Sequence, residues 1–224
     1  MSMTLPDLPA PPYLSQWGDP ACNAAVVGRG EDPAPLHDWR SDGYLSADDY
    51  RWWSRQTCGL ACLQMVLASA PDRWPRPPRK AALLADAVAA GALTPRDDGT
   101  VGGLYYAPFV DWVARDFGLH AVSRPDLPVA ELAERVASGA WLAMASVSCE
   151  IRTPDVAPTH TGGHLVLVHA VVRGESGGVE GLVFHNPSGL PAGPGAPGTA
   201  ECARCAPGRF ALFYAGRGIL VRRP

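Results

Sequence analysis

The stretch of residues 55–67 constrains the fold of this chain more than any other part of it. It reads Arg-Gln-Thr-Cys-Gly-Leu-Ala-Cys-Leu-Gln-Met-Val-Leu, and its apolar residues leave no wide polar face. A helix of that composition is expected to be buried. Thr57 is a suitable N-cap because its hydroxyl can accept an unpaired N–H of the first turn, which Cys58 would then occupy. The sequence therefore predicts a buried central helix with a cysteine at its N-terminus.

Cys58 is a candidate nucleophile. The positive end of the helix dipole favours thiolate over thiol, so the position predicts a lowered pKa for this cysteine. Gly59 has no side chain beside the sulfur and would let a substrate backbone come close. The alternative is that Cys58 is a small buried apolar residue, as free cysteines often are. The choice between them depends on whether the chain also supplies a base and a group that orients the base.

Composition excludes several classes of protein. The 224 residues, of which 47% are hydrophobic, suit one domain with a real core. A net charge of −3, without a Lys/Arg cluster interleaved with aromatic residues, points to neither nucleic acid nor an anionic membrane as a partner. Six cysteines are too few for a disulfide scaffold. The N-terminus does not resemble a signal peptide and no apolar run reaches membrane-spanning length, so we expect a cytoplasmic protein.

Helical patterns dominate the first part of the chain and strand patterns the last. We expect helices from Ser46 to Trp53 and over residues 57–70, 80–90, 106–117 and 129–137. We expect strands over residues 13–17, 119–123, 141–147, 165–172, 182–184, 210–214 and 219–221. Turns and loops are expected at 97–103, which includes Asp97 and Asp98, at 191–208, and at 215–218 as a hairpin connection.

This order predicts an α+β fold in which a helical N-terminal half packs on an antiparallel sheet from the C-terminal half. One domain should span residues 1–224, with a helical part at 57–140 and a sheet part at 141–224. Residues 18–50 show no periodicity and are expected to form an irregular insertion anchored by Trp39, Tyr44 and Tyr50.

His164 is the favoured base among the six histidines. It follows Gly162 and Gly163 at the start of a long apolar run, which would hold an imidazole on a rigid strand at a point open to substrate. His185, His160 and His169 remain alternatives, with His169 more typical of a core residue. His37 and His120 have no context that recommends them.

Asn186 is the candidate orienting group. It ends a short strand, and Pro187 after it favours an extended backbone from which the amide can reach an imidazole nitrogen. The alternative is that Asn-Pro-Ser-Gly is only a turn.

Taken together, these motifs resemble the bacteriocin-processing peptidases, a family of papain-like cysteine peptidases that cleave leader peptides, here in a soluble stand-alone form. The matching elements are Cys58 and Gly59 at the start of a helix, a Gly-His strand at His164, and Asn186 with Pro187. The family's Pro-x-x-x-Gln element matches residues 12–16. The resemblance implies a papain-like fold in which residues 12–17 form the oxyanion strand and Gln16 is the oxyanion donor.

The chain also departs from the family pattern. Gln16 is much farther from Cys58 in sequence than the family's glutamine is from its cysteine, and Gln56 is a rival oxyanion donor. Asn186 stands where the family usually has Asp, although papain-like enzymes commonly use Asn.

No metal or other cofactor is expected. Cys202 and Cys205 form one Cys-x-x-Cys pair in a loop rich in proline and glycine. A structural zinc site needs four ligands, and the sequence contains no second pair at a suitable spacing.

The sequence thus predicts a cysteine hydrolase acting on a peptide or peptide-like amide. The expected catalytic residues are Cys58, His164, Asn186 and Gln16, and the expected substrate contacts are Trp17, Gly162 and Gly163. An acyltransferase or peptide cyclase with the same catalytic residues is one alternative, since an amine can replace water in resolving an acyl-thioester. A catalytically silent binding module is the other.

Overall fold

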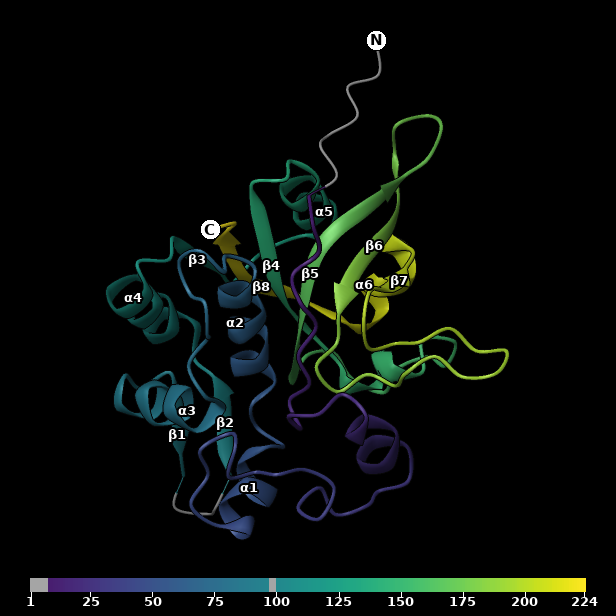
Figure 1. Ribbon diagram of the computed structural model, residues 1–224. Coiled ribbons are helices and arrows are strands. Elements are labelled where there is room, and N and C mark those ends of the chain that lie inside the picture. The colour runs from purple at the N-terminus through teal and green to yellow at the C-terminus, as the bar shows by residue number, and fades with distance from the viewer. Residues whose placement is uncertain (1–7, 97–99) are drawn as a thin grey trace.

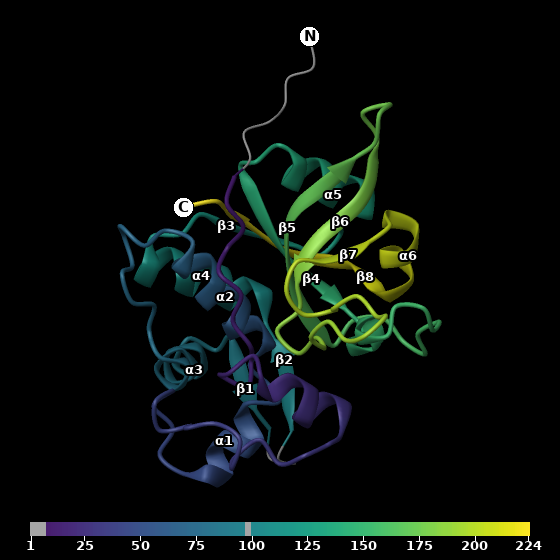
Figure 2. The same ribbon diagram turned by 45° about the vertical axis from the view of Figure 1, so that its right-hand side comes forward.

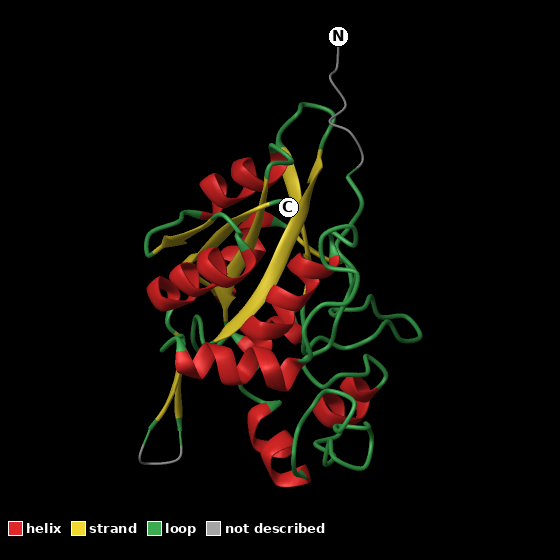
Figure 3. Ribbon diagram, turned by 60° about the vertical axis from the view of Figure 1, so that its left-hand side comes forward, coloured by secondary structure: helices red, strands yellow, loops and turns green. Residues whose placement is uncertain are grey.

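A six-stranded antiparallel sheet forms the centre of the protein (Figure 1). The computed structural model describes residues 8–96 and 100–224, so the turn expected at Asp97 and Asp98 lies outside the described residues. In sheet order the strands are β3 (Ala121–Arg124), β8 (Tyr214–Arg222), β4 (Trp141–Val147), β5 (His164–Arg173), β6 (Val179–His185) and β7 (Ala203–Cys205). A separate ribbon of β1 (Leu93–Pro95) and β2 (Val101–Leu104) stands apart from the large sheet (Figure 3).

Helices cover both faces of the large sheet (Figures 1 and 2). They are α1 (Ala47–Trp53), α2 (Cys58–Ala68), α3 (Lys80–Ala89), α4 (Tyr106–Phe117), α5 (Val129–Ala137) and α6 (Pro207–Phe213), with a π-helix η1 (Ala24–Gly28) and a 3₁₀-helix η2 (Cys149–Arg152). Side chains of β4 alternate between two cores, because successive residues of a strand point to opposite faces. Leu142 and Met144 pack in the core with α2, whereas Ala143 and Ala145 pack in the core with α5 and α6.

Helix α2 is the buried central helix that the sequence predicts. Its residues from Gly59 to Leu67 are all buried, and it packs against β5. A Cβ at Gly59 would lie 3.0 Å from side-chain carbons of both Leu104 and Leu165, so a larger residue would require these side chains to shift. The predicted N-cap bond is wrong, because the Thr57 hydroxyl donates to Ser54 O (3.3 Å) instead of accepting from the helix.

The α+β class is confirmed, but two details of its predicted layout are wrong. Helices also cover the second face, and β3 joins the sheet from the part expected to be helical. The strand expected at 210–214 belongs to α6, where Phe210 and Phe213 are fully buried at helical spacing. The hairpin expected at 215–218 is part of the continuous strand β8. There, a side chain at Gly218 would collide with Met144 O of β4, so glycine permits the pairing.

Three further loop and strand predictions also change. The loop expected at 191–208 contains β7, and the glycine-rich loop expected at 97–103 contains part of β2. Residues 13–17 contribute only an isolated bridge between Ser15 and Gly18 and form no strand.

Residues 18–50 are an ordered excursion and not a structureless loop. They contain η1 and the start of α1, whose N-cap Ser46 accepts a hydrogen bond from Asp49 N (3.0 Å) as the sequence predicts. Tyr44 and Tyr50 are buried in the main core, with their rings 5.4 Å apart. The Tyr50 hydroxyl donates to Trp17 O (2.7 Å), which fastens the end of the excursion to its beginning.

Lys80, the only lysine in the chain, is buried at the start of α3. Its Nζ donates to Ser15 O (2.9 Å) and Gln16 O (3.1 Å) and lies 3.7 Å from Asp42 Oδ2. Burial lowers the pKa of Lys80, and the Asp42 carboxylate opposes this effect. Lys80 therefore joins the segment that carries Gln16 to the helical side of the fold.

We predict that Lys80→Met lowers the free energy of unfolding by about 2–4 kcal/mol, because, among the described residues, Gln16 O loses its Lys80 donor, Ser15 O keeps only the Gly18 N–H and the Asp42 carboxylate keeps only His37. Chemical denaturation measures the change, with Arg79→Met at the exposed neighbouring position as the control. Equal stability of the two variants would contradict the role assigned to Lys80.

Candidate active site

A cavity of about 470 Å³ opens between α2, β5 and the β1–β2 ribbon. Cys58, the first residue of α2, and His164, the first residue of β5, both line it. The packing of α2 on β5 thus places in one cavity lining two residues that are far apart in the chain.

No helix within residues 8–96 and 100–224 is long and apolar enough to cross a membrane.

The amide of Asn186 holds the imidazole of His164 in a defined orientation. Ser188 N donates to Asn186 Oδ1 (3.1 Å), which identifies this atom as the amide oxygen. The same oxygen lies 2.8 Å from His164 Nε2. Since two acceptors cannot share a hydrogen bond, Nε2 carries the hydrogen and donates it. In the neutral imidazole, Nδ1 is then the nitrogen with a free lone pair.

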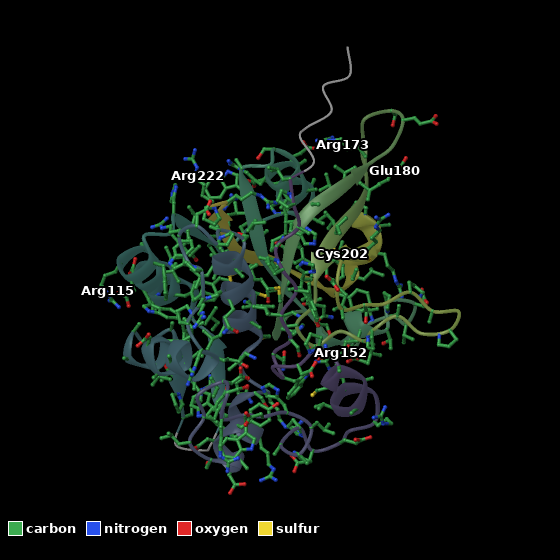
Figure 4. The ribbon with its side chains drawn as sticks, in the orientation of Figure 1. Arg115, Arg152, Arg173, Glu180, Cys202 and Arg222 are labelled. Carbon is green, nitrogen blue, oxygen red and sulfur yellow. The ribbon has the colours of Figure 1, made fainter. Side chains whose placement is uncertain are left out.

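Arg152 and Ser188 extend this hydrogen-bonded group. The Ser188 hydroxyl accepts from Arg152 Nε (3.1 Å) and Nη2 (2.6 Å), and its oxygen lies 3.2 Å from His164 Nε2. Figure 4 shows Arg152 beside the start of β5 and the end of β6. No carboxylate pairs with Arg152 among the described residues, so its positive charge acts directly on the site.

Burial favours the neutral forms of both His164 and Cys58. It lowers the pKa of His164 to about 4, against the opposing effect of the hydrogen bond that His164 donates to Asn186. It also raises the pKa of the Cys58 thiol, whereas the backbone N–H groups of Leu165 and Gly59 and the charge of Arg152 lower it. No hydrogen bond joins the Cys58 sulfur to His164 in the described part of the chain. The site therefore rests as thiol and imidazole, and not as the thiolate that the helix position alone predicts.

The other candidate bases lie away from the cavity lining. His185 Nε2 donates to Pro11 O (2.7 Å), and its Nδ1 accepts from Cys202 N (3.1 Å), so neither nitrogen is free. His169 is buried against the His185 ring, 4.4 Å between centroids. His160 lies 3.4 Å from Glu150 in an exposed loop. Of the histidines, His164 is the one that lines the cavity with Cys58.

Gln16 lies between the two halves of the site. Its backbone N–H donates to Pro187 O (3.0 Å), beside Asn186, and its side-chain Nε2 donates to Ser54 O (3.0 Å), shortly before α2. Gln16 Oε1 is buried with no hydrogen-bond partner among the described residues. The side chain is buried and does not line the cavity, whereas Gln56 does.

The expected substrate contacts are placed unequally. Gly163 lines the cavity, and no described atom lies within 4 Å of where its Cβ would be. Gly162 is buried directly behind it, and Trp17 is buried outside the cavity lining. No described cavity-lining residue comes from 18–50. Residues 18–50 therefore do not cover the cavity.

His169, His185 and Cys202 form a group whose potential ligand atoms lie within 4.8 Å of one another. Both nitrogens of His185 are engaged, which leaves one imidazole and one thiol. These are fewer than the three or four protein ligands of a typical zinc site. All six cysteines are free.

Ser188 and Arg152 were not predicted as site residues. Ser188 follows Asn186 by two residues, and a side chain at that spacing commonly folds back on an Asx turn, which is a usable local signal. Arg152 comes from η2, and no local pattern marks it, because its position depends on how η2 packs beside the sheet.

Comparison of the chain with protein-family models, with curated proteins and with solved structures finds no match. The geometry by itself defines a cysteine on a helix N-terminus and a histidine held by an asparagine, both beside one cavity.

We predict that Arg152→Gln raises the pKa of both Cys58 and His164. The guanidinium charge stabilises the thiolate and repels the imidazolium, so its removal makes the thiolate harder and the imidazolium easier to form. The pH dependence of Cys58 alkylation and an NMR titration of the His164 ring measure the two values. Ser188→Ala, which keeps the charge, is the control. An unchanged pair of pKa values in Arg152→Gln would contradict the electrostatic role.

The buried His164 also predicts acid sensitivity. Its folded-state pKa is below the ordinary 6.5, so the unfolded chain binds a proton that the folded chain does not, and stability falls as pH drops from about 6.5 to about 4. The loss amounts to at most about 3 kcal/mol, since one pKa unit corresponds to about 1.4 kcal/mol. Urea denaturation at several pH values should show a weaker pH dependence for His164→Gln than for the exposed control His120→Gln. Identical pH dependence of the two variants would show that the folded-state pKa of His164 is not lowered.

Proposed function

We propose that this protein is a papain-like cysteine hydrolase that cleaves a peptide or peptide-like amide. The observation that carries the proposal is that Cys58 and His164 line one cavity while Asn186 Oδ1 accepts the hydrogen of His164 Nε2 (2.8 Å). A nucleophile, a base and a group that orients the base are the parts that such catalysis needs. The packing of the cysteine-bearing helix against an antiparallel sheet also supports a papain-like architecture.

The resting charge state suggests how the reaction begins. His164 Nδ1 takes the thiol proton as Cys58 Sγ attacks the substrate carbonyl, because Nε2 already donates to Asn186. The tetrahedral intermediate then collapses, the amine leaves with the proton from His164, and an acyl-thioester remains on Cys58. Water, deprotonated by the same imidazole, releases the acid and restores the thiol. Asn186 stabilises the imidazolium that forms in each step.

The oxyanion of the intermediate needs hydrogen-bond donors. The backbone N–H of Cys58 at the helix N-terminus is one. Gln16 is proposed as the second donor, because residues 12–16 resemble the Pro-x-x-x-Gln element of the bacteriocin-processing peptidases. The hydrogen bond from its side chain to Ser54 O supports a position near α2. Gln56 is the rival, because it lines the cavity as observed.

Two other functions are compatible with these residues. An acyltransferase or peptide cyclase would use the same thioester and transfer the acyl group to an amine. A catalytically silent binding module is favoured by one observation, the raised pKa of the Cys58 thiol without a hydrogen bond to His164.

We predict that a peptide-like epoxide, a class of reagent that requires an activated cysteine, modifies Cys58 in the wild-type protein and fails to do so in His164→Gln. Intact-mass spectrometry and peptide mapping locate the adduct, with Cys58→Ser as the negative control. Removal of an oxyanion donor costs about 100–1,000-fold in turnover, so steady-state assays of Gln16→Ala and Gln56→Ala identify the donor.

The same variants and reagents distinguish the alternative functions. Modification of Cys58 only by small unselective reagents, and equally in His164→Gln, would contradict an enzyme and favour the binding module. With a cleaved substrate, products formed in the presence and absence of added amines distinguish hydrolysis from acyl transfer.

A further inference from the structure

The described side chains that line the cavity include basic groups and no carboxylate. Arg55, Arg217 and His164 line it, and the described lining residues include no aspartate, glutamate or lysine. An enclosed wall of one sign attracts ligands of the opposite sign. The two arginines differ in their surroundings, and the difference shows which of them is available to a ligand.

Arg55 is partly compensated. The pKa of the Asp32 carboxyl is lowered chiefly by its hydrogen bond with Arg51 and further by the charge of Arg55, whose guanidinium lies 6.0 Å from the centroid of the Trp17 ring. Arg217, on β8, is exposed to the cavity, and no carboxylate pairs with it among the described residues.

Arg217 is also part of a group of hydrogen-bond donors. Arg217, Tyr106 and Ser146 all line the cavity. The position that a Cβ would take at Gly162 lies 3.3 Å from Ser146 Oγ and 3.7 Å from Arg217 Nη2, so these two groups lie close together beside the backbone that precedes Gly163 and His164. Burial raises the pKa of the Tyr106 hydroxyl, and the Ser146 hydroxyl and the charge of Arg217 oppose the rise, in agreement with this arrangement.

We propose that Arg217, Tyr106 and Ser146 bind a carboxylate of the substrate next to the amide that Cys58 attacks. Arginine presents planar N–H donors that match a carboxylate, and hydroxyls complete its hydrogen bonding. Cys58 lines the same cavity as these three residues, so the anion and the scissile carbonyl belong to one small ligand. This inference rests on the proposed function and assigns its substrate class: an amide with a terminal or side-chain carboxylate close to the bond that is cleaved.

The test uses three iodoacetyl reagents of similar size on the full chain. Iodoacetyl-glycine carries a terminal carboxylate, iodoacetyl-glycinamide carries none, and iodoacetyl-glutamate amidated at its α-carboxyl carries only a side-chain carboxylate. The rate of Cys58 alkylation is measured by mass spectrometry and divided by the rate with glutathione, which corrects for intrinsic reactivity. Alkylation needs no turnover, so it tests carboxylate binding even if the proposed hydrolase activity is absent.

We expect at least one carboxylate reagent to alkylate Cys58 about 10-fold faster than the amide reagent, as a charge-assisted hydrogen bond implies. The preferred reagent tells whether the carboxylate is terminal or on a side chain. Arg217→Gln should remove most of the preference. Arg222→Gln, on the same strand but at the edge of the molecule far from Arg152 in Figure 4, should leave the preference intact.

Equal rates for the three reagents in the wild-type protein would overturn the proposal, as would a preference that persists in Arg217→Gln. A failure of every reagent to reach Cys58 would also overturn it, because the proposed ligand must enter the same cavity. If the epoxide fails to modify Cys58 in the wild-type protein, or modifies it equally in His164→Gln, the proposed hydrolase is contradicted, whereas the carboxylate inference still stands.

Discussion

The close packing of α2 on β5 is the contact on which the rest of the site depends. Glycine at position 59 favours this contact, because a Cβ there would lie 3.0 Å from side-chain carbons of Leu104 and Leu165. The contact places the first residue of the helix and the first residue of the strand in the lining of one cavity, although 106 residues separate Cys58 from His164 in the sequence. The N-terminal segment is fastened on one side of this contact by Lys80 and on the other by Pro187 O, which brings Gln16 between the two halves.

The site favours the neutral forms of Cys58 and His164 and lowers the cost of charge only locally. Desolvation disfavours both the thiolate and the imidazolium, while Arg152 favours the first and disfavours the second. In the proposed reaction, the thiol attacks as its proton moves to His164, in the presence of a substrate that fills the cavity. Burial against water would also protect an acyl-thioester until the second substrate, water or amine, arrives.

The sequence predicts the regular elements well where hydrophobic periodicity is long. The boundaries of α4, α5 and β4 match the predicted ranges, because each has an apolar face over seven or more residues. The run at 210–214 is too short for its period to distinguish helix from strand, and α6 forms there because Phe210 and Phe213 reach one core. The roles expected for His164 and Asn186 follow from their glycine and proline neighbours, whereas the position of Arg152 beside the site and the raised pKa of Cys58 arise from long-range packing that no local pattern encodes.

The measurement that tests the account most directly is a search for the acyl-thioester itself. The protein is mixed with the p-nitrophenyl ester of N-acetylglycine and quenched in acid at short times, and its intact mass is measured by mass spectrometry. The account predicts a transient mass increase of one acyl group on Cys58, removed by hydroxylamine and formed much more slowly in His164→Gln. No adduct, or an adduct that forms equally fast without the imidazole, would contradict the claim that Cys58 and His164 act together.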